Sequence, residues 1–245
     1  MLSKRISIQW PPQEAGENTS TMVIYSKEGH FVDVRIFLEN YPVIEENPTS
    51  KFDDIFEWAM VGDEISLEST IPDTYKLQFT HEIDSLAIMK AINENLPLDQ
   101  CLTEADVGTF WKTDTEDRKE TGNMTNPATG KKEDYVEIWR SVSSVQHTPE
   151  NEVREPADEE VTPLYVLRID TDEFHGQMIR SGNWIQGILH DKKNSKVPLN
   201  VIRCYVKDSK WEYLINYSNF KFPVDFDGAK GDSITIDNVK WTCIE

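Results

Sequence analysis

The sequence predicts an all-β protein made of two antiparallel β-barrel halves, with one short helix in the N-terminal half. Apolar and polar residues alternate with period two along much of the chain, which is typical of strands that bury one face. Turn-forming clusters separate many of these segments. With 245 residues, 38% hydrophobic and 28% charged, the chain is long and apolar enough for two modest cores.

Three segments show this alternation most clearly. Their apolar faces are predicted to be Val32, Val34, Ile36 and Leu38; Tyr75, Leu77 and Phe79; and Trp211, Tyr213, Ile215 and Tyr217. Only residues 84–95 have helical spacing, with Asp84 as the N-cap and Pro97 beyond the end. The missing crossover helices exclude a parallel α/β fold.

Residues 146–160 (QHTPENEVREPADEE) are expected to form an acidic linker, because they offer almost no apolar surface to bury. They separate an N-terminal barrel domain, residues 1–145, from a C-terminal barrel domain, residues 161–245. The two halves look like weak copies of each other. FEWAMVG around Trp58 corresponds to GNWIQG around Trp184, which supports the hypothesis of an internal duplication.

The net charge of −19 is unevenly distributed. Residues 1–145 hold 13 Lys/Arg and 27 Asp/Glu, residues 146–160 hold 1 and 6, and residues 161–245 hold 11 and 11. The net charges are therefore −14, −5 and zero. Without a basic footprint, we expect neither nucleic acid nor a membrane surface as a partner. The acidity either serves solubility or attracts a basic partner.

The chain is expected to work in a reducing compartment, the cytosol or the nucleus. It has no apolar run long enough to span a bilayer, its first twelve residues lack the apolar region of a secretory signal, and its three cysteines are far apart. No catalytic, metal or cofactor motif stands out: the five histidines are scattered, and Cys-x-x-Cys, Gly-x-Ser-x-Gly and His-Glu-x-x-His are all absent. We therefore predict a non-enzymatic protein with no cofactor and no metal.

Several segments, in order and through most of the chain, resemble the fungal Hri proteins, a family named for interaction with a yeast casein kinase I. The matching segments are residues 28–35 (EGHFVDVR), 56–62 (FEWAMVG), 135–139 (YVEIW), 182–189 (GNWIQGIL) and 200–203 (NVIR). The likeness fails between about residues 84 and 106 and across the linker. It implies two tandem lipocalin-like barrels, a cytoplasmic and nuclear location, and association with a casein-kinase-I-type protein kinase. It supplies no catalytic residues.

Two kinds of candidate site follow. Thr162, preceded by Asp158, Glu159 and Glu160, and Thr49, preceded by Glu45 and Glu46, are candidate phospho-acceptors, because casein kinase I favours acids before its target. Trp184, in a Gly-x-Trp tripeptide like that of lipocalin-like barrels, and Trp58 are candidate barrel plugs or pocket residues.

The leading functional hypothesis is an interaction protein that binds a kinase. The alternative is a carrier that holds a small apolar ligand in one barrel.

Overall fold

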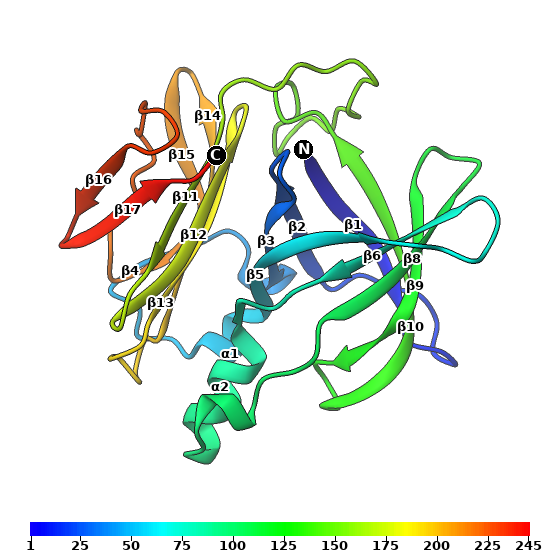
Figure 1. The fold of residues 1–245 in the computed structure, drawn as a ribbon, viewed down its shortest axis with the longest axis horizontal. Helices are drawn as coiled ribbons and strands as arrows, with labels where there is room; N and C mark the ends of the chain where they lie inside the picture. The colour runs from blue at the N-terminus through cyan, green and yellow to red at the C-terminus, as the bar shows by residue number, and fades with distance from the viewer.

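The first sheet closes into an eight-stranded antiparallel barrel, because β3 pairs with β2 on one side and β5 on the other (Figure 1). This is the arrangement in the computed structural model, which describes residues 1–245. Around the barrel the strands are β1 (Leu2–Gln9), β2 (Thr19–Tyr25), β3 (His30–Phe37), β5 (Phe56–Leu67), β6 (Thr74–Phe79), β8 (Asp106–Lys112), β9 (Arg118–Asn126) and β10 (Lys131–Val142). The predicted all-β barrel is confirmed for the N-terminal half.

The second sheet has eight strands and stays open. Its order is β16 (Ser233–Ile236), β17 (Val239–Cys243), β11 (Leu164–Asp170), β12 (Phe174–Ser181), β13 (Trp184–Asp191), β14 (Leu199–Lys207), β15 (Lys210–Ser218) and β4 (Val43–Glu46). The outer strands β16 and β4 are not paired with each other, so the prediction of a second closed barrel is wrong. Strand β4 comes from the N-terminal half and pairs in parallel with β15, so the division at residue 146 does not separate two sheets.

The strand β3 shows why the two sheets pack together. Val32, Val34 and Ile36 belong to a core cluster of 26 buried residues that takes members from both sheets. Asp33 and Arg35, on the other face of the strand, are buried inside the barrel. Both faces of β3 are therefore buried, one against the open sheet and one within the barrel.

The strand β15 departs from the predicted alternation. Trp211 and Tyr213 pack against one core cluster, whereas Ile215 and Tyr217 belong to the other. The register with β14 shifts between Arg203 and Cys204, which indicates a β-bulge. A bulge adds a residue to one strand and so reverses which face the following side chains occupy.

The predicted helix is present as α2 (Ser85–Glu94). The Asp84 side chain accepts a hydrogen bond from the Leu86 amide at 2.9 Å, and Asn95 ends the helix in the left-handed conformation. The remaining short elements are β7 (Ile83–Asp84), α1 (Phe52–Ile55), and the 3-10 helices η1 (Leu38–Asn40) and η2 (Leu98–Gln100). No helix in the structure has both the length and the apolar character to cross a membrane.

Polar side chains from the open sheet hold it against the barrel. The Arg203 guanidinium, fully buried on β14, donates hydrogen bonds to the carbonyl oxygens of Ser20 at 3.2 Å and Val34 at 2.8 Å. Gln186, the cross-strand neighbour of Arg203 on β13, donates to the carbonyl oxygens of Met22 at 2.9 Å and Val32 at 2.8 Å. Burial lowers the pKa of Arg203, and the nearby Tyr41 and Asp33 oppose this shift only in part.

Residues 146–160 pack against both sheets, which corrects the prediction of a solvated linker. Glu152 forms a 2.6 Å ion pair with Arg140 of the barrel. His147 is buried, its ring is stacked on Trp184 of the open sheet, and its carbonyl accepts a 3.0 Å hydrogen bond from the Trp184 indole. The segment is poor in apolar residues, but its polar groups find partners on the barrel and the sheet, and this outcome is not encoded in its composition.

We expect Arg203→Met to lower the free energy of unfolding by about 2–4 kcal/mol, because acceptors on both sheets lose a charged donor inside the interface. Urea denaturation measures the change. Lys210→Met, at an exposed lysine on the same sheet, is the control and should change stability by less than about 0.5 kcal/mol. Equal midpoints for the two variants would show that Arg203 does not hold the sheets together.

Candidate functional site

The barrel interior contains a buried network of charged side chains. The Arg5 guanidinium donates to Glu17 at 2.7 Å and to Glu137 at 2.8 Å. Arg35 pairs with Asp33 at 2.9 Å. Although burial by itself would lower it, Glu137 and Glu17 raise the pKa of Arg5 above its ordinary value, so this arginine stays charged. The interior is therefore polar at its centre.

Glu120 on β9 is the carboxyl group whose protonation the barrel interior alters most. Burial, and next the nearby charge of Glu137, raise the pKa of Glu120 to about 8. Tyr135 and Trp139 of β10 donate hydrogen bonds to its two oxygens at 2.6 and 2.8 Å. A Cβ at Gly108 would lie 2.2 Å from one of these oxygens, so only glycine fits opposite the carboxyl group. The two hydrogen bonds oppose the rise in pKa, but burial outweighs them, so Glu120 holds its proton to a higher pH than an exposed carboxyl group does.

The cavity beside this network measures about 40 Å³. Asp33, Arg35, Glu120 and Glu137 line it together with aromatic side chains. A volume of this size accommodates a few water molecules, whereas ligand pockets usually measure several hundred cubic ångströms. The barrel interior is thus filled by its own side chains.

The two candidate tryptophans lie in different places. Trp58 is buried in the barrel, where its indole donates to Asp84 at 2.9 Å and the Arg35 guanidinium lies 4.8 Å from its ring. Trp184 lies outside the barrel, on β13, between His147 and Tyr205. Trp184 packs where the open sheet meets residues 146–160. Neither tryptophan therefore lines an open pocket in a barrel.

A second candidate site is an acidic cleft on the surface, where residues 146–160 meet the β2–β3 turn. The cleft has a volume of about 660 Å³, and its lining includes Glu155, Glu159, Glu160, Lys27 and Thr162. Burial raises the pKa of Glu155; the N-terminal amino group of Met1, which also lines the cleft, opposes this shift, and the charge of Glu159 adds to it. The accumulated carboxylates suit a basic segment of a partner.

The structure separates the two candidate phospho-acceptors. Thr162 is exposed at the edge of the acidic cleft. Thr49 is also exposed but does not line the cleft. It follows β4, where the Glu45 carboxylate accepts a 2.7 Å hydrogen bond from Ser50. Of the two, only Thr162 lines the acidic cleft.

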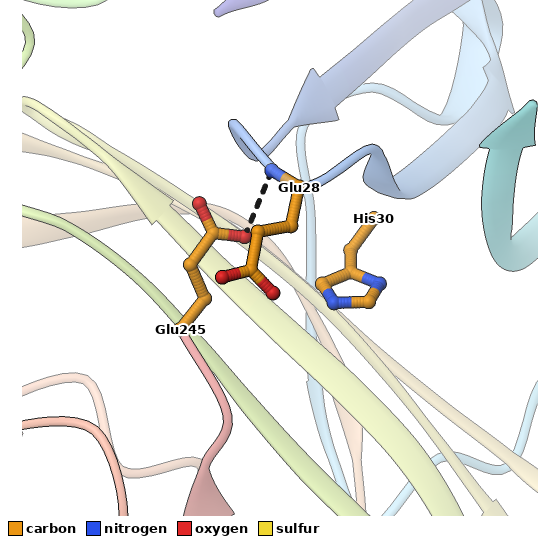
Figure 2. Close-up of side chains that lie close together, drawn as sticks. All are labelled: Glu28, His30 and Glu245. Atoms are coloured by element: carbon orange, nitrogen blue, oxygen red, sulfur yellow. Dashed lines mark hydrogen bonds between the residues drawn. The ribbon is translucent and has the colours of Figure 1, made fainter. Parts of the chain in front are cut away.

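A group of side chains with metal-ligating atoms lies where the β2–β3 turn meets the last residue of the chain (Figure 2). Glu28, His30 and Glu245 each offer one ligand atom, and these atoms lie within 4.8 Å of one another. His30 Nδ1 contacts Asp63 at 2.5 Å, and its other ring nitrogen faces the Glu28 carboxylate (Figure 2). No pattern in the sequence pointed to this group, because Glu245 is 215 positions from His30.

The two carboxylates of this group already have partners within the protein. Lys230 Nζ contacts Glu28 at 2.8 Å, and the Glu245 carboxylate accepts a hydrogen bond from the Lys27 amide at 2.9 Å. It also accepts one from the Glu28 amide at 3.2 Å (Figure 2). The group could hold a divalent cation only if Lys230 moved away. Its geometry is also that of a polar contact between the C-terminal residue and the barrel.

The fold and these sites define a class of protein: an all-β protein in which a closed barrel with a charged interior packs on an open sheet. The family model described as Protein HRI1 matches residues 1–245, and the chain belongs to this family. The resemblance to the fungal Hri proteins is thereby confirmed.

Relatives and a solved structure match over nearly the whole chain. Protein HRI1 of Candida glabrata is 30% identical and is aligned over 100% of this chain and 98% of its own. Protein HRI1 of a Saccharomyces cerevisiae strain is 28% identical, with coverages of 100% and 98%. The crystal structure of an uncharacterized Saccharomyces cerevisiae protein, 26% identical, has a TM-score of 0.76 and covers 100% of this chain and 97% of that one.

We expect Glu120→Gln to stabilise the protein increasingly as pH rises. The raised pKa of Glu120 means that its contribution to stability is fully present below pH 4.5, declines as pH rises, and is lost once pH passes about 8. Glutamine imitates the protonated acid and does not ionise. Urea midpoints at pH 5, 7 and 9 should therefore show a growing advantage over wild type. Glu94→Gln, at an exposed position, is the control; a pH-independent difference for Glu120→Gln would contradict the shift.

We expect EDTA and a reductant to leave the melting temperature unchanged. The Glu28 and Glu245 carboxylates have protein partners, and all three cysteines are buried and free. Differential scanning calorimetry with 5 mM EDTA, and separately with a reductant, measures this. A fall of several degrees with EDTA that His30→Ala abolishes would instead show a structural metal at this group.

Proposed function

We propose that this chain is a non-enzymatic interaction protein that associates with a casein-kinase-I-type protein kinase through its acidic N-terminal half and residues 146–160. The observation that carries the proposal is the acidic cleft with Thr162 at its edge. The partner is the one implied by the family resemblance. The action of such a protein would be to present surfaces to other proteins in the cytoplasm and nucleus.

The charge distribution supports this choice of surface. Residues 1–160 carry a net charge of −19 and residues 161–245 a net charge of zero. Asp158 and Glu160 are exposed next to Thr162 and take part in no ion pair, so both charges are available to a partner. Complementary charge mainly accelerates encounter, and this effect weakens as salt rises.

The barrel interior supports an interaction protein over a carrier. If the barrel is lipocalin-like, as the resemblance implies, a ligand would lie in its interior, where the cavity measures only about 40 Å³ and contains charged side chains. A small apolar ligand gains little from such surroundings. The same volume leaves no room for a substrate beside Glu120, the interior carboxyl group most suited to acid–base chemistry.

The experiment is a binding measurement between the full chain and a purified kinase of this class, by biolayer interferometry at 50 and 500 mM salt. We expect affinity to fall with salt, and Asp158→Asn combined with Glu160→Gln to weaken binding by about threefold to tenfold at low salt. Asp225→Asn combined with Asp227→Asn removes two exposed charges from the neutral half and should have no effect.

Two results would contradict the proposal in different ways. No binding of the wild-type chain at 50 mM salt would remove the kinase as a partner. Kinase binding that changes neither with salt nor in the variant with Asp158→Asn and Glu160→Gln would support the kinase as a partner. It would contradict binding through the acidic surface.

A further inference from the structure

The region around α2 and η2 exposes several leucines. Leu96 is 39% exposed, Leu98 is 37% exposed and Leu102 is 53% exposed, all within seven consecutive residues. Ala87, Ile88 and Ala91 of α2 are buried. Grouped exposed leucines are uncommon on a chain with 28% charged residues and often mark an interaction surface.

Two of these leucines, Leu96 and Leu98, line a groove between the two halves. The groove has a volume of about 630 Å³; Ile88, Ile92, Leu96 and Leu98 line it on the helix side, and the β13–β14 connection, residues 192–198, lines the other. This volume accommodates several side chains of a bound segment. The floor is apolar, so a partner would bury apolar side chains there.

The opposite rim of the groove is basic, in contrast to the rest of this acidic protein. Lys192 and Lys193 line it, and Lys196 follows on the same connection. Lys192 pairs with Asp170 at 3.2 Å, whereas Lys193 and Lys196 form no ion pair. Both are exposed, so their charges are available to a partner.

The acidic and titratable groups beside the rim do not cancel this charge. Asp191 is the one carboxylate among the lining residues, and it is largely buried and accepts the Lys193 amide at 3.0 Å. Burial, and next the charges of His175 and Lys192, lower the pKa of His190 to about 4, so this lining histidine is neutral. Lys90 and Glu94 of α2 line a different groove.

We infer that this groove docks an amphipathic acidic segment of a partner protein. Its apolar side chains would pack on Ile92, Leu96 and Leu98, and its carboxylates would face Lys193 and Lys196. An apolar floor with a charged rim is the usual composition of a groove that holds an amphipathic helix. The surface is separate from the acidic cleft and takes a partner of the opposite charge.

The test uses two fluorescein-labelled helical peptides of 14 residues that share one stripe of leucines. The remaining positions are glutamate in one peptide and lysine in the other. The net charge of −19 alone would attract the lysine peptide, so the inference predicts the opposite of non-specific electrostatics. Fluorescence anisotropy with the full chain should show at least tenfold tighter binding of the glutamate peptide.

Two pairs of matched variants locate the binding. Lys193→Glu with Lys196→Glu should weaken binding of the glutamate peptide about tenfold, whereas Lys210→Glu with Lys240→Glu, at exposed lysines outside the groove, should not. Leu98→Asn should weaken it several-fold, whereas Leu67→Asn, at a leucine 38% exposed on β5, should not.

Four outcomes would overturn the inference. The glutamate peptide could fail to bind at 1 mM protein. The lysine peptide could bind equally well or better, or the groove and control variants could behave alike. Finally, sedimentation could show a dimer of this chain that Leu98→Asn dissociates, in which case a second copy covers the groove. None of these results depends on whether the kinase binds.

Discussion

The hydrogen bonds from Arg203 and Gln186 to the main chain of β2 and β3 are the contact on which the rest of the structure depends. A buried guanidinium that has no carboxylate as an ion-pair partner is tolerated only where carbonyl groups accept hydrogen bonds from it. Those acceptors belong to the barrel, so separating the open sheet from the barrel would leave the charge of Arg203 without these hydrogen-bond acceptors. The open sheet is therefore fixed in one position on the barrel, and β4 extends it by one further strand.

The fixed position of the open sheet on the barrel explains where the candidate sites lie. The acidic cleft forms where residues 146–160 join the barrel to the sheet, and the basic-rimmed groove forms where α2 meets the β13–β14 connection. Each is lined by segments distant in sequence. A rigid interface between the barrel and the open sheet holds such segments in a constant arrangement. This reduces the conformational entropy lost when a partner binds.

The barrel interior contrasts with these surfaces. Arg5, Arg35, Asp33 and Glu137 form ion pairs there, and the aromatic side chains around them leave a cavity of about 40 Å³. The network favours one arrangement of the interior over others, because each charged group needs its own partner. The barrel thus serves as a rigid support, and interaction with other molecules is left to its outer surface.

The sequence alone determined the all-β class, the capped helix at residues 84–95, the family and the acidic charge, because these depend on local spacing, composition and conserved order. Only the tertiary structure decided that the second sheet stays open, that a bulge divides the aromatic residues of β15 between two cores, and that burial raises the pKa of Glu120. Period-two alternation shows that a face is buried but not against what. Strand partners, bulges and the surroundings of a carboxyl group arise from residues far apart in the chain, and no local pattern records them.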